Sequence, residues 1–152
     1  MPRHEPAPAA ATAEPCPVAR SLDAIGDRWS LLIVRDAFDG LRRFGDFQRN
    51  LGVARNILAD RLRRLVQAGI LQTQPASDGS AYQEYVLTPR GETLFPVVLA
   101  LRQWGEQHLF RRGERHSLLV ERRTGKPVPF MAPLARDGSV LAPDATKVKK
   151  VA

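Results

Sequence analysis

Apolar residues recur at helical spacing in the first ordered part of the chain. The spacing i, i+4, i+7 predicts a first helix that begins near Cys16-Pro17 and ends at Gly26. Asp27 can cap a second helix through its carboxylate, and Gly40 ends that helix. Val18, Leu22 and Ile25 lie on one face of the first helix. The side chains expected to turn inward from the second helix are Trp29, Leu32, Ile33 and Phe38.

A short helix, a glycine turn and a longer amphipathic helix follow. The segment FGDFQRNLG has helical apolar spacing up to Gly52, and ARNILADRLRRLVQAG forms a stronger helix that stops at Gly69. One side of the longer helix carries Leu58, Leu62 and Leu65. Within about 80° of the opposite side lie Asn56, Ala59, Asp60, Arg63 and Gln67. This succession is typical of a helix-turn-helix.

Two short β-prone runs, residues 70–73 and 82–87, predict a hairpin directly after this motif. The intervening PASDGSA contains Asp-Gly, a strong turn signal. A hairpin in this position is a wing. Thr88 before Pro89 then predicts the start of a long helix to about Phe110, with an apolar stripe interrupted by Pro96 and Gly105.

The expected fold class is mainly α with a small β wing: a winged helix-turn-helix, followed by a small β-rich C-terminal extension. Residues 1–15 are rich in Pro and Ala and predict a disordered tail, and residues 16–110 form the domain. In residues 111–152, three strand-like runs at 117–121, 128–131 and 140–141 are separated by Thr-Gly-Lys and Arg-Asp-Gly turns. They predict a β appendage with a basic tail.

Composition excludes several classes of protein. The 152 residues contain no apolar run near the roughly 18 that a membrane span needs, and the N-terminus lacks the apolar segment of a secretory signal. Cys16 is the only cysteine, which excludes an intramolecular disulfide and a zinc site built from cysteines. We therefore expect a cytoplasmic protein without metal or cofactor. His4, His108 and His116 lack ligand spacing, and no catalytic motif is present, so nothing predicts an enzyme.

The charge predicts an anionic partner. The formal net charge is +7, and residues 40–66 hold seven arginines against two aspartates. Residues 111–152 hold ten cations against four anions. Nucleic acid and an anionic membrane surface both fit such a balance, and solvated faces are the simpler alternative.

A protruding helix of this kind fits the major groove of DNA, which is about 12 Å wide. Asn56 can pair with adenine and Arg63 with guanine, whereas Arg55, at the helix start, can reach a base or a phosphate. Asp60 can accept a hydrogen bond from cytosine or pair with Arg63 or Arg64, and the ion pair is favoured. The remaining candidate DNA contacts are the phosphate-binding Arg42, Arg43 and Arg49, the helix residues Ala54 and Ala59, and the wing residues Ser77 and Ser80. The wing carries no Lys or Arg, and Asp78 would repel phosphate.

Cys16 is a candidate redox sensor. It lies at a helix start, where the helix dipole favours the reactive thiolate, and only another molecule could supply a disulfide partner. The alternative is a small, partly buried residue at a helix start.

Several motifs together resemble the HxlR family of bacterial transcription regulators. The segment CPVARSLDAIGDRWSLLIVRDAFDGLRRFGDF looks like the family's opening, and NLGVARNILADRLRRLVQAGIL resembles its recognition region. YQEYVLTPRGETL resembles its second wing strand and the entry to its last helix, so the resemblance covers about residues 16–110. The chain departs from it in having Gln72 and Gln74 where a basic residue commonly enters the wing, and in its long C-terminal segment.

The resemblance implies a winged helix-turn-helix homodimer of MarR-like architecture that joins through its terminal helices. It also implies control of nearby genes and, in some members, oxidant sensing through a cysteine at the position of Cys16. The interface candidates are Val18, Leu22, Ile25, Leu94, Val97, Val98, Leu101 and Trp104.

The predicted function is therefore a sequence-specific transcriptional regulator that binds a pseudo-palindrome in double-stranded DNA as a homodimer. Control by a small effector or by oxidation of Cys16 is part of this hypothesis. Two alternatives remain: a winged-helix protein-interaction module without specific DNA binding, and a binder of anionic membrane or nonspecific nucleic acid that acts through its basic tail. The sequence leaves open the operator, the effector and the choice between repressor and activator.

Overall fold

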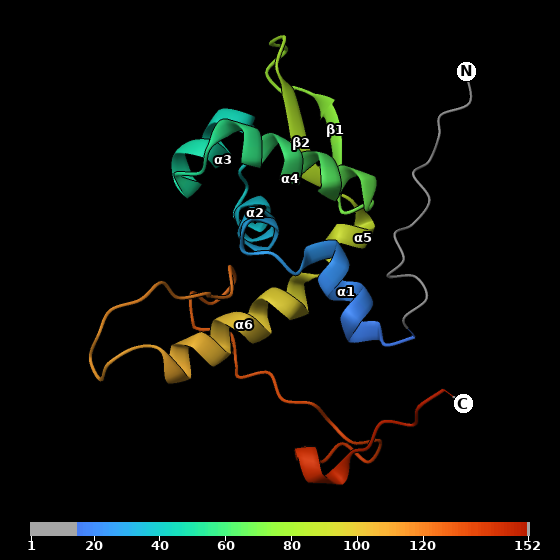
Figure 1. Cartoon of the computed structure of the whole chain (residues 1–152). Coiled ribbons are helices and arrows are strands. Elements are labelled where there is room, and N and C mark those ends of the chain that lie inside the picture. Colours follow the sequence, from blue (N-terminus) through green and yellow to red (C-terminus); the bar gives the residue numbers. More distant parts are fainter. Residues whose placement is uncertain (1–14, 152) are drawn as a thin grey trace. The chain divides into compact units, whose positions relative to one another are not determined.

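The computed structural model of the chain describes residues 15–151 (Figure 1). They form two compact units, divided between Phe95 and Pro96, which we call the N-terminal unit and the C-terminal unit. The expected disordered tail, with His4, lies outside the described residues except for Pro15. In the described part of the chain no helix is long and apolar enough to cross a membrane.

Four helices open the N-terminal unit, with bounds close to those the apolar spacing predicts. They are α1 (Pro17–Ile25), α2 (Arg28–Phe38), α3 (Phe44–Leu51) and α4 (Arg55–Gln67). The predicted cap of α2 is confirmed: the backbone N–H of Ser30 donates to the carboxylate of Asp27 over 3.0 Å. Gly52 ends α3 in the left-handed conformation, with φ of 63°, which glycine adopts without strain.

The core of this unit lies under α4, which packs against α1, α2, α3 and the first strand of the wing (Figure 1). The predicted inner side of α4 is confirmed, because its three leucines are fully buried. The apolar side chains buried in the unit are Ile25, Ile33, Val34, Phe47, Val53, Leu58, Leu62, Leu65, Ile70, Leu71 and Ala76.

The predicted wing is an antiparallel hairpin of β1 (Leu71–Pro75) and β2 (Gln83–Leu87) (Figure 1). Gly79 has φ of 76° in the turn, as the Asp-Gly signal predicts. On the other edge of β2, the backbone N–H of Tyr85 donates to the carbonyl of Arg42 over 2.7 Å. The loop before α3 is thereby fastened to the wing.

The prediction of one long helix from Pro89 to about Phe110 is wrong in one respect, because the structure has two helices there. α5 (Pro89–Glu92) is one short turn, capped by the hydroxyl of Thr88, and α6 (Phe95–His108) follows after a break. Pro96 explains the break. It has no N–H to donate, and its ring would clash with the carbonyl of Glu92 in a continuous helix.

The C-terminal unit consists of α6 from Pro96 onward and the segment that follows it. The strand-like runs expected there form only two isolated bridges, Val120–Pro127 and Leu134–Val140, and a 3-10 helix η2 (Pro143–Ala145) comes later. A β-rich extension therefore overstates the regular structure of this segment. The prolines at 127, 129 and 133 supply no N–H donor, so a longer ladder cannot form.

Candidate nucleic-acid interface

The outer face of α4 carries exposed side chains along the length of the helix. Asn56, Ala59 and Arg63 are exposed there, and Ala54 and Arg55 are exposed at the helix start. Their backbone is held from below by the buried leucines of α4. A helix supported on one side and bare on the other has the dimensions to enter a groove of DNA.

Asp60 holds the arginines of this helix together. Its carboxylate pairs with Arg63 at i+3, with Arg64 at i+4 over 3.0 Å, and with Arg61 over 2.6 Å. Desolvation alone would raise the pKa of Asp60, but the hydrogen bond from Arg63 and the charge of Arg64 lower it below its ordinary value. The favoured interpretation of Asp60 as an ion-pair partner is therefore the one the structure presents.

Arg61 links α4 to the start of α2. Its Nε donates to the Asp27 carboxylate over 2.9 Å, and the same carboxylate caps Ser30. Desolvation raises the pKa of Asp27, and the hydrogen bonds from Ser30 and Arg61 more than reverse this, so the pKa is lowered. Sequence reasoning missed this pair, because no local pattern connects residues 34 positions apart.

The loop arginines that were expected to contact phosphate are engaged with the wing. Arg42 lies 3.5 Å from the carboxylate of Glu84, a weak pair at an exposed guanidinium. Arg43 pairs with Asp78 at the wing turn and also lies 5.6 Å from the ring centre of Tyr82. The carboxylate that would repel phosphate is thus neutralised by the chain itself.

The two remaining arginine candidates have partners on α3. Arg49 pairs with Asp46 one turn earlier, and it stays largely exposed. The guanidinium of Arg55 lies 4.9 Å from the ring centre of Phe44. Stacking of this kind leaves the N–H donors at the edge of Arg55 available to a ligand.

The two wing serines are used within the wing. The backbone N–H and the hydroxyl of Ser77 both donate to Glu84 over 3.1 Å, and the backbone N–H of Ser80 donates to Asp78 over 3.0 Å. The Ser77 backbone hydrogen bond is the main reason that the pKa of the buried Glu84 carboxyl is lowered. Hydrogen bonds from Ser80 and from Arg43 lower the pKa of Asp78 to about 2.

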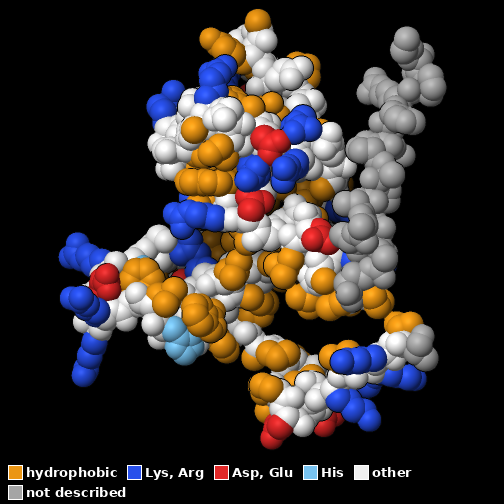
Figure 2. All heavy atoms as spheres, in the orientation of Figure 1, with side chains coloured by type: hydrophobic (Ala, Val, Ile, Leu, Met, Phe, Trp, Pro, Cys, Tyr) orange, Lys and Arg blue, Asp and Glu red, His pale blue; other side chains and the backbone are white. Residues whose placement is uncertain are grey.

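Basic and acidic side chains are interleaved over α4 on the face that Figure 2 shows. The pairs made by Asp60 and Asp27 account for this mixture. The outer face of α4 is therefore less positive than its arginine count indicates.

The candidate interface residues differ in exposure. On α1, Val18 and Leu22 are exposed, whereas Ile25 is buried inside the N-terminal unit. On α6, Val97, Leu101 and Trp104 are exposed, and Val98 is half-buried. Leu94, between α5 and α6, is half-buried as well. Cys16 is exposed at the N-cap of α1, so it is not the partly buried residue of the alternative interpretation.

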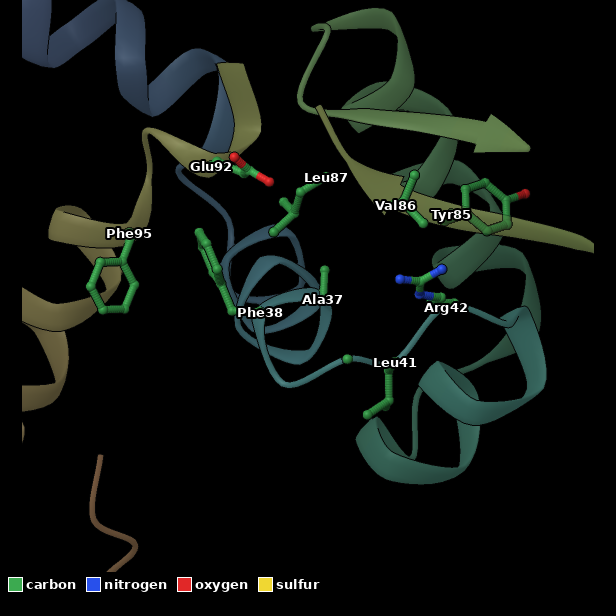
Figure 3. A pocket seen from close by; sticks show the side chains of 10 residues that line it. Ala37, Phe38, Leu41, Arg42, Tyr85, Val86, Leu87, Glu92 and Phe95 are labelled. Carbon is green, nitrogen blue, oxygen red and sulfur yellow. The ribbon is translucent and has the colours of Figure 1, made fainter. Parts of the chain in front are cut away.

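An open cavity of about 550 Å³ lies in the N-terminal unit between the end of α2 and β2 (Figure 3). Its apolar wall includes Phe38, Leu87 and Phe95, and the rings of Phe38 and Phe95 meet edge to face with centres 5.6 Å apart. Arg42 and Tyr85 approach from the opposite side in Figure 3. Among residues 15–151, no cluster of three acidic, His or Cys side chains could hold a metal ion.

Comparison with known proteins gives consistent matches. Residues 24–112 match the model of the HxlR-like helix-turn-helix family. Rv3095 of Mycobacterium tuberculosis, named as an HTH-type transcriptional regulator, is 47% identical over 94 residues, which are 62% of this chain and 60% of that protein. The match therefore covers less than two thirds of the length of this curated relative.

Two solved structures are similar to different lengths of the chain. The crystal structure of PA1607, a proposed transcription factor, matches with a TM-score of 0.88 and 54% identity, and covers 93% of this chain and 99% of that chain. The redox regulator HypR in its reduced form matches with a TM-score of 0.57 and 34% identity, and covers 62% of this chain and 94% of that chain. The longer match includes most of the segment beyond residue 112, and the shorter one does not cover it in full.

Proposed function

The chain belongs to the HxlR-like helix-turn-helix family, and we propose that it is a transcriptional regulator that binds a pseudo-palindromic operator as a homodimer. Transcriptional regulators are not a class of enzyme. The observation that carries the proposal is the outer face of α4, where Asn56 and Arg63 are exposed on a helix fixed by its buried leucines. Two such helices in a dimer would contact half-sites about one helical turn, ~34 Å, apart.

Base contacts by α4 can be tested directly. Genomic fragments bound by the protein are first selected with excess competitor DNA at about 0.15 M salt, which should enrich fragments that share a pseudo-palindrome. On such a fragment, Asn56→Ala or Arg63→Ala should cost about 1–3 kcal/mol of binding and relax specificity at one position. Arg90→Ala, which removes an exposed arginine outside the helix-turn-helix, is the control. Uniform weak recovery of fragments would favour the protein-interaction module instead.

Arg42 is proposed to contact phosphate, because its pair with Glu84 is long and its guanidinium is exposed. A phosphate contact positions the protein without distinguishing bases. Arg42→Ala should therefore weaken binding to all sequences alike and lower the salt slope by about one. A loss confined to the selected fragment would instead assign Arg42 to base recognition.

Control by a small effector is supported by the open cavity, since Arg42 is both part of its lining and a candidate DNA contact. An apolar ligand with an anionic group would fit its apolar wall and guanidinium. Benzoate is a minimal probe of this class. It should raise the melting temperature of the protein, and Arg42→Gln should abolish the rise.

Redox control is supported by the exposure of Cys16 at the start of α1 and by the similarity to a protein named as a redox regulator. Diamide should then convert the protein to a dimer that survives a non-reducing gel. Cys16→Ser should not form this dimer. If the wild-type protein gives no such band, Cys16 is not a sensor of this type.

A further inference from the structure

The segment after α6, which we call the arm (residues 111–151), is fastened to one face of that helix. The side-chain amide of Gln103, which is buried, donates to the carbonyl of Pro129 over 3.0 Å and accepts from the N–H of Met131 over 2.8 Å. Arg102 donates to the carbonyl and hydroxyl of Ser117 over 3.1 and 2.9 Å. The arm is therefore held to α6 at Ser117 and again at Pro129 and Met131.

The arm therefore covers the face of α6 that carries Leu99 and Gln103. Leu119 and Val128 of the arm lie against it, and the hollow left between them measures only about 30 Å³. The same face includes the pair between Arg102 and Glu106.

The opposite face of α6 is a bare apolar stripe. Val97, Leu101 and Trp104 are spaced by four and three residues, and their exposure lies between 42 and 57%. Val97 lies two positions from the covered Leu99, which turns it about 200° around the helix. The arm of the same chain thus covers one face of α6 and leaves the stripe uncovered.

The arm also exposes apolar side chains of its own. Leu118, Phe130, Leu134 and Val140 are between 60 and 68% exposed. Leu134 and Val140 face each other across an antiparallel bridge, so their side chains lie on the same side of it.

We propose that Leu118, Phe130, Leu134 and Val140 of the arm form part of the interface with a second copy of this chain, together with the stripe on α6. The inference rests on the homodimer of the proposed function and extends it beyond the terminal helices. A two-fold interface uses one patch twice, so a unit that exposes both a regular apolar stripe and separate apolar side chains supplies both halves of the contact.

The exposed area fits such a partner. A stable interface buries about 800 Å² on each side, and a large aromatic side chain alone can bury roughly 150–250 Å². The three stripe residues and the four arm residues named above are seven large exposed apolar side chains, two of them aromatic.

The test compares variants of the full-length chain by sedimentation equilibrium. The double variant Phe130→Ser, Leu134→Ser changes exposed side chains only, so the fold of the N-terminal unit should be retained, which circular dichroism checks. We expect its dimer dissociation constant to rise at least about tenfold. The matched control, Arg122→Gln with Arg123→Gln, changes the same arm by charge alone and should leave the dissociation constant unchanged.

A third variant separates this inference from the proposed homodimer. Leu101→Asp places a charge in the α6 stripe and should dissociate the dimer. If it does so while the serine variant dimerises like wild type, the arm is not at the interface and the inference fails, although the homodimer stands. If the wild-type chain remains monomeric at all concentrations, both fail. If the glutamine control weakens binding to random-sequence DNA while the serine variant leaves dimerisation intact, the arm is a DNA-binding surface instead.

Discussion

The two units of the molecule bury their apolar residues very differently. Of the twelve apolar side chains that are buried in the described chain, eleven belong to the N-terminal unit and only Leu99 belongs to the C-terminal unit. The C-terminal unit instead exposes most of its large apolar side chains, including Trp104 and Phe130. Figure 2 shows such side chains at the surface along α6. Domains of this small size are marginal even with a good core, so a unit without one needs other surfaces to cover it.

The two units also differ in how their charged side chains are paired. In the N-terminal unit, the arginines of the helix-turn-helix and of the loop before α3 are mostly paired with carboxylates of the same unit, among them Asp60 and Asp78. The ten cations of the C-terminal segment form no ion pair within residues 111–151. The N-terminal unit thus has a well-buried apolar interior, and the positive charge on the outer face of α4 is partly neutralised. The C-terminal unit has exposed apolar side chains and positive charge that no carboxylate within residues 111–151 pairs with.

The largest expected effect comes from comparing the substitution of one leucine in each unit. Leu62 is fully buried under α4, so Leu62→Ala should cost about 2–5 kcal/mol of unfolding free energy. Leu101→Ala, on the exposed stripe, should change it by less than about 0.5 kcal/mol in dilute, monomeric protein. Urea unfolding followed by circular dichroism measures both. A large cost for Leu101→Ala in the monomer would mean that the stripe is covered within the chain.

Local rules predicted the N-terminal unit well because its structure follows from neighbouring residues. Gly26 and Gly52 end helices, Asp27 caps α2, and the side-chain period of α4 separates its buried leucines from its outer face. Each of these features depends on contacts within about one helical turn. Hydrophobic spacing and turn chemistry determine such contacts.

The features that sequence reasoning missed all depend on distant partners. The pair of Arg61 with Asp27 and the clamp of Gln103 on the arm join residues 34 and 26 to 28 positions apart. No spacing rule indicates which of several arginines meets which carboxylate in the folded chain. The break before α6 was different, since Pro96 was recognised as an interruption of the stripe but not as the end of a helix.

Removing the hydrogen bonds between Gln103 and the arm should give the second largest effect. Gln103→Ala removes both hydrogen bonds to the arm backbone and leaves buried groups unpaired, which costs about 1–3 kcal/mol locally. Hydrogen exchange at the amide of Met131 should accelerate accordingly, while amides of α4 keep their protection. Gln107→Ala, on an exposed position of the same helix, is the matched control. Unchanged exchange at Met131 would show that the arm is held by other contacts.

Removing one paired carboxylate should sharpen the contrast in charge. Asp60→Asn releases Arg63 and Arg64 on the outer face of α4. Binding to a random-sequence DNA duplex should therefore tighten by up to about tenfold at low salt, and the salt slope should be steeper by about one. Asp144→Asn makes the same change of charge in the arm. Titrations by fluorescence anisotropy at several salt concentrations compare the two. Equal effects would mean that total charge, and not the pairing on α4, governs this binding.

The smallest effect concerns two matching turns, Asp78-Gly79-Ser80 in the wing and Asp137-Gly138-Ser139 in the arm. Both aspartates accept a hydrogen bond from the serine two residues later, and this bond lowers the pKa of each. Only Asp78 also pairs with Arg43, and its pKa falls to about 2 from an ordinary 3.8. Because the folded pKa is the lower one, the contribution of Asp78 to stability is complete above about pH 4 and is lost as the pH falls toward 2.

Carbon-detected NMR titration of the two carboxyl groups tests this difference. Raising the salt from about 0.05 to 0.5 M should raise the pKa of Asp78 more than that of Asp137, because salt screens the charge of Arg43 and leaves a local hydrogen bond largely intact. Asp78→Asn should also reduce the loss of unfolding free energy between pH 4 and 2, whereas Asp137→Asn should not affect the N-terminal unit. Equal salt responses would mean that the serine hydrogen bond alone sets both values. Arg43 would then contribute nothing to the pKa of Asp78. That arginine would be as available to DNA as the cations of the arm, which form no ion pair within residues 111–151.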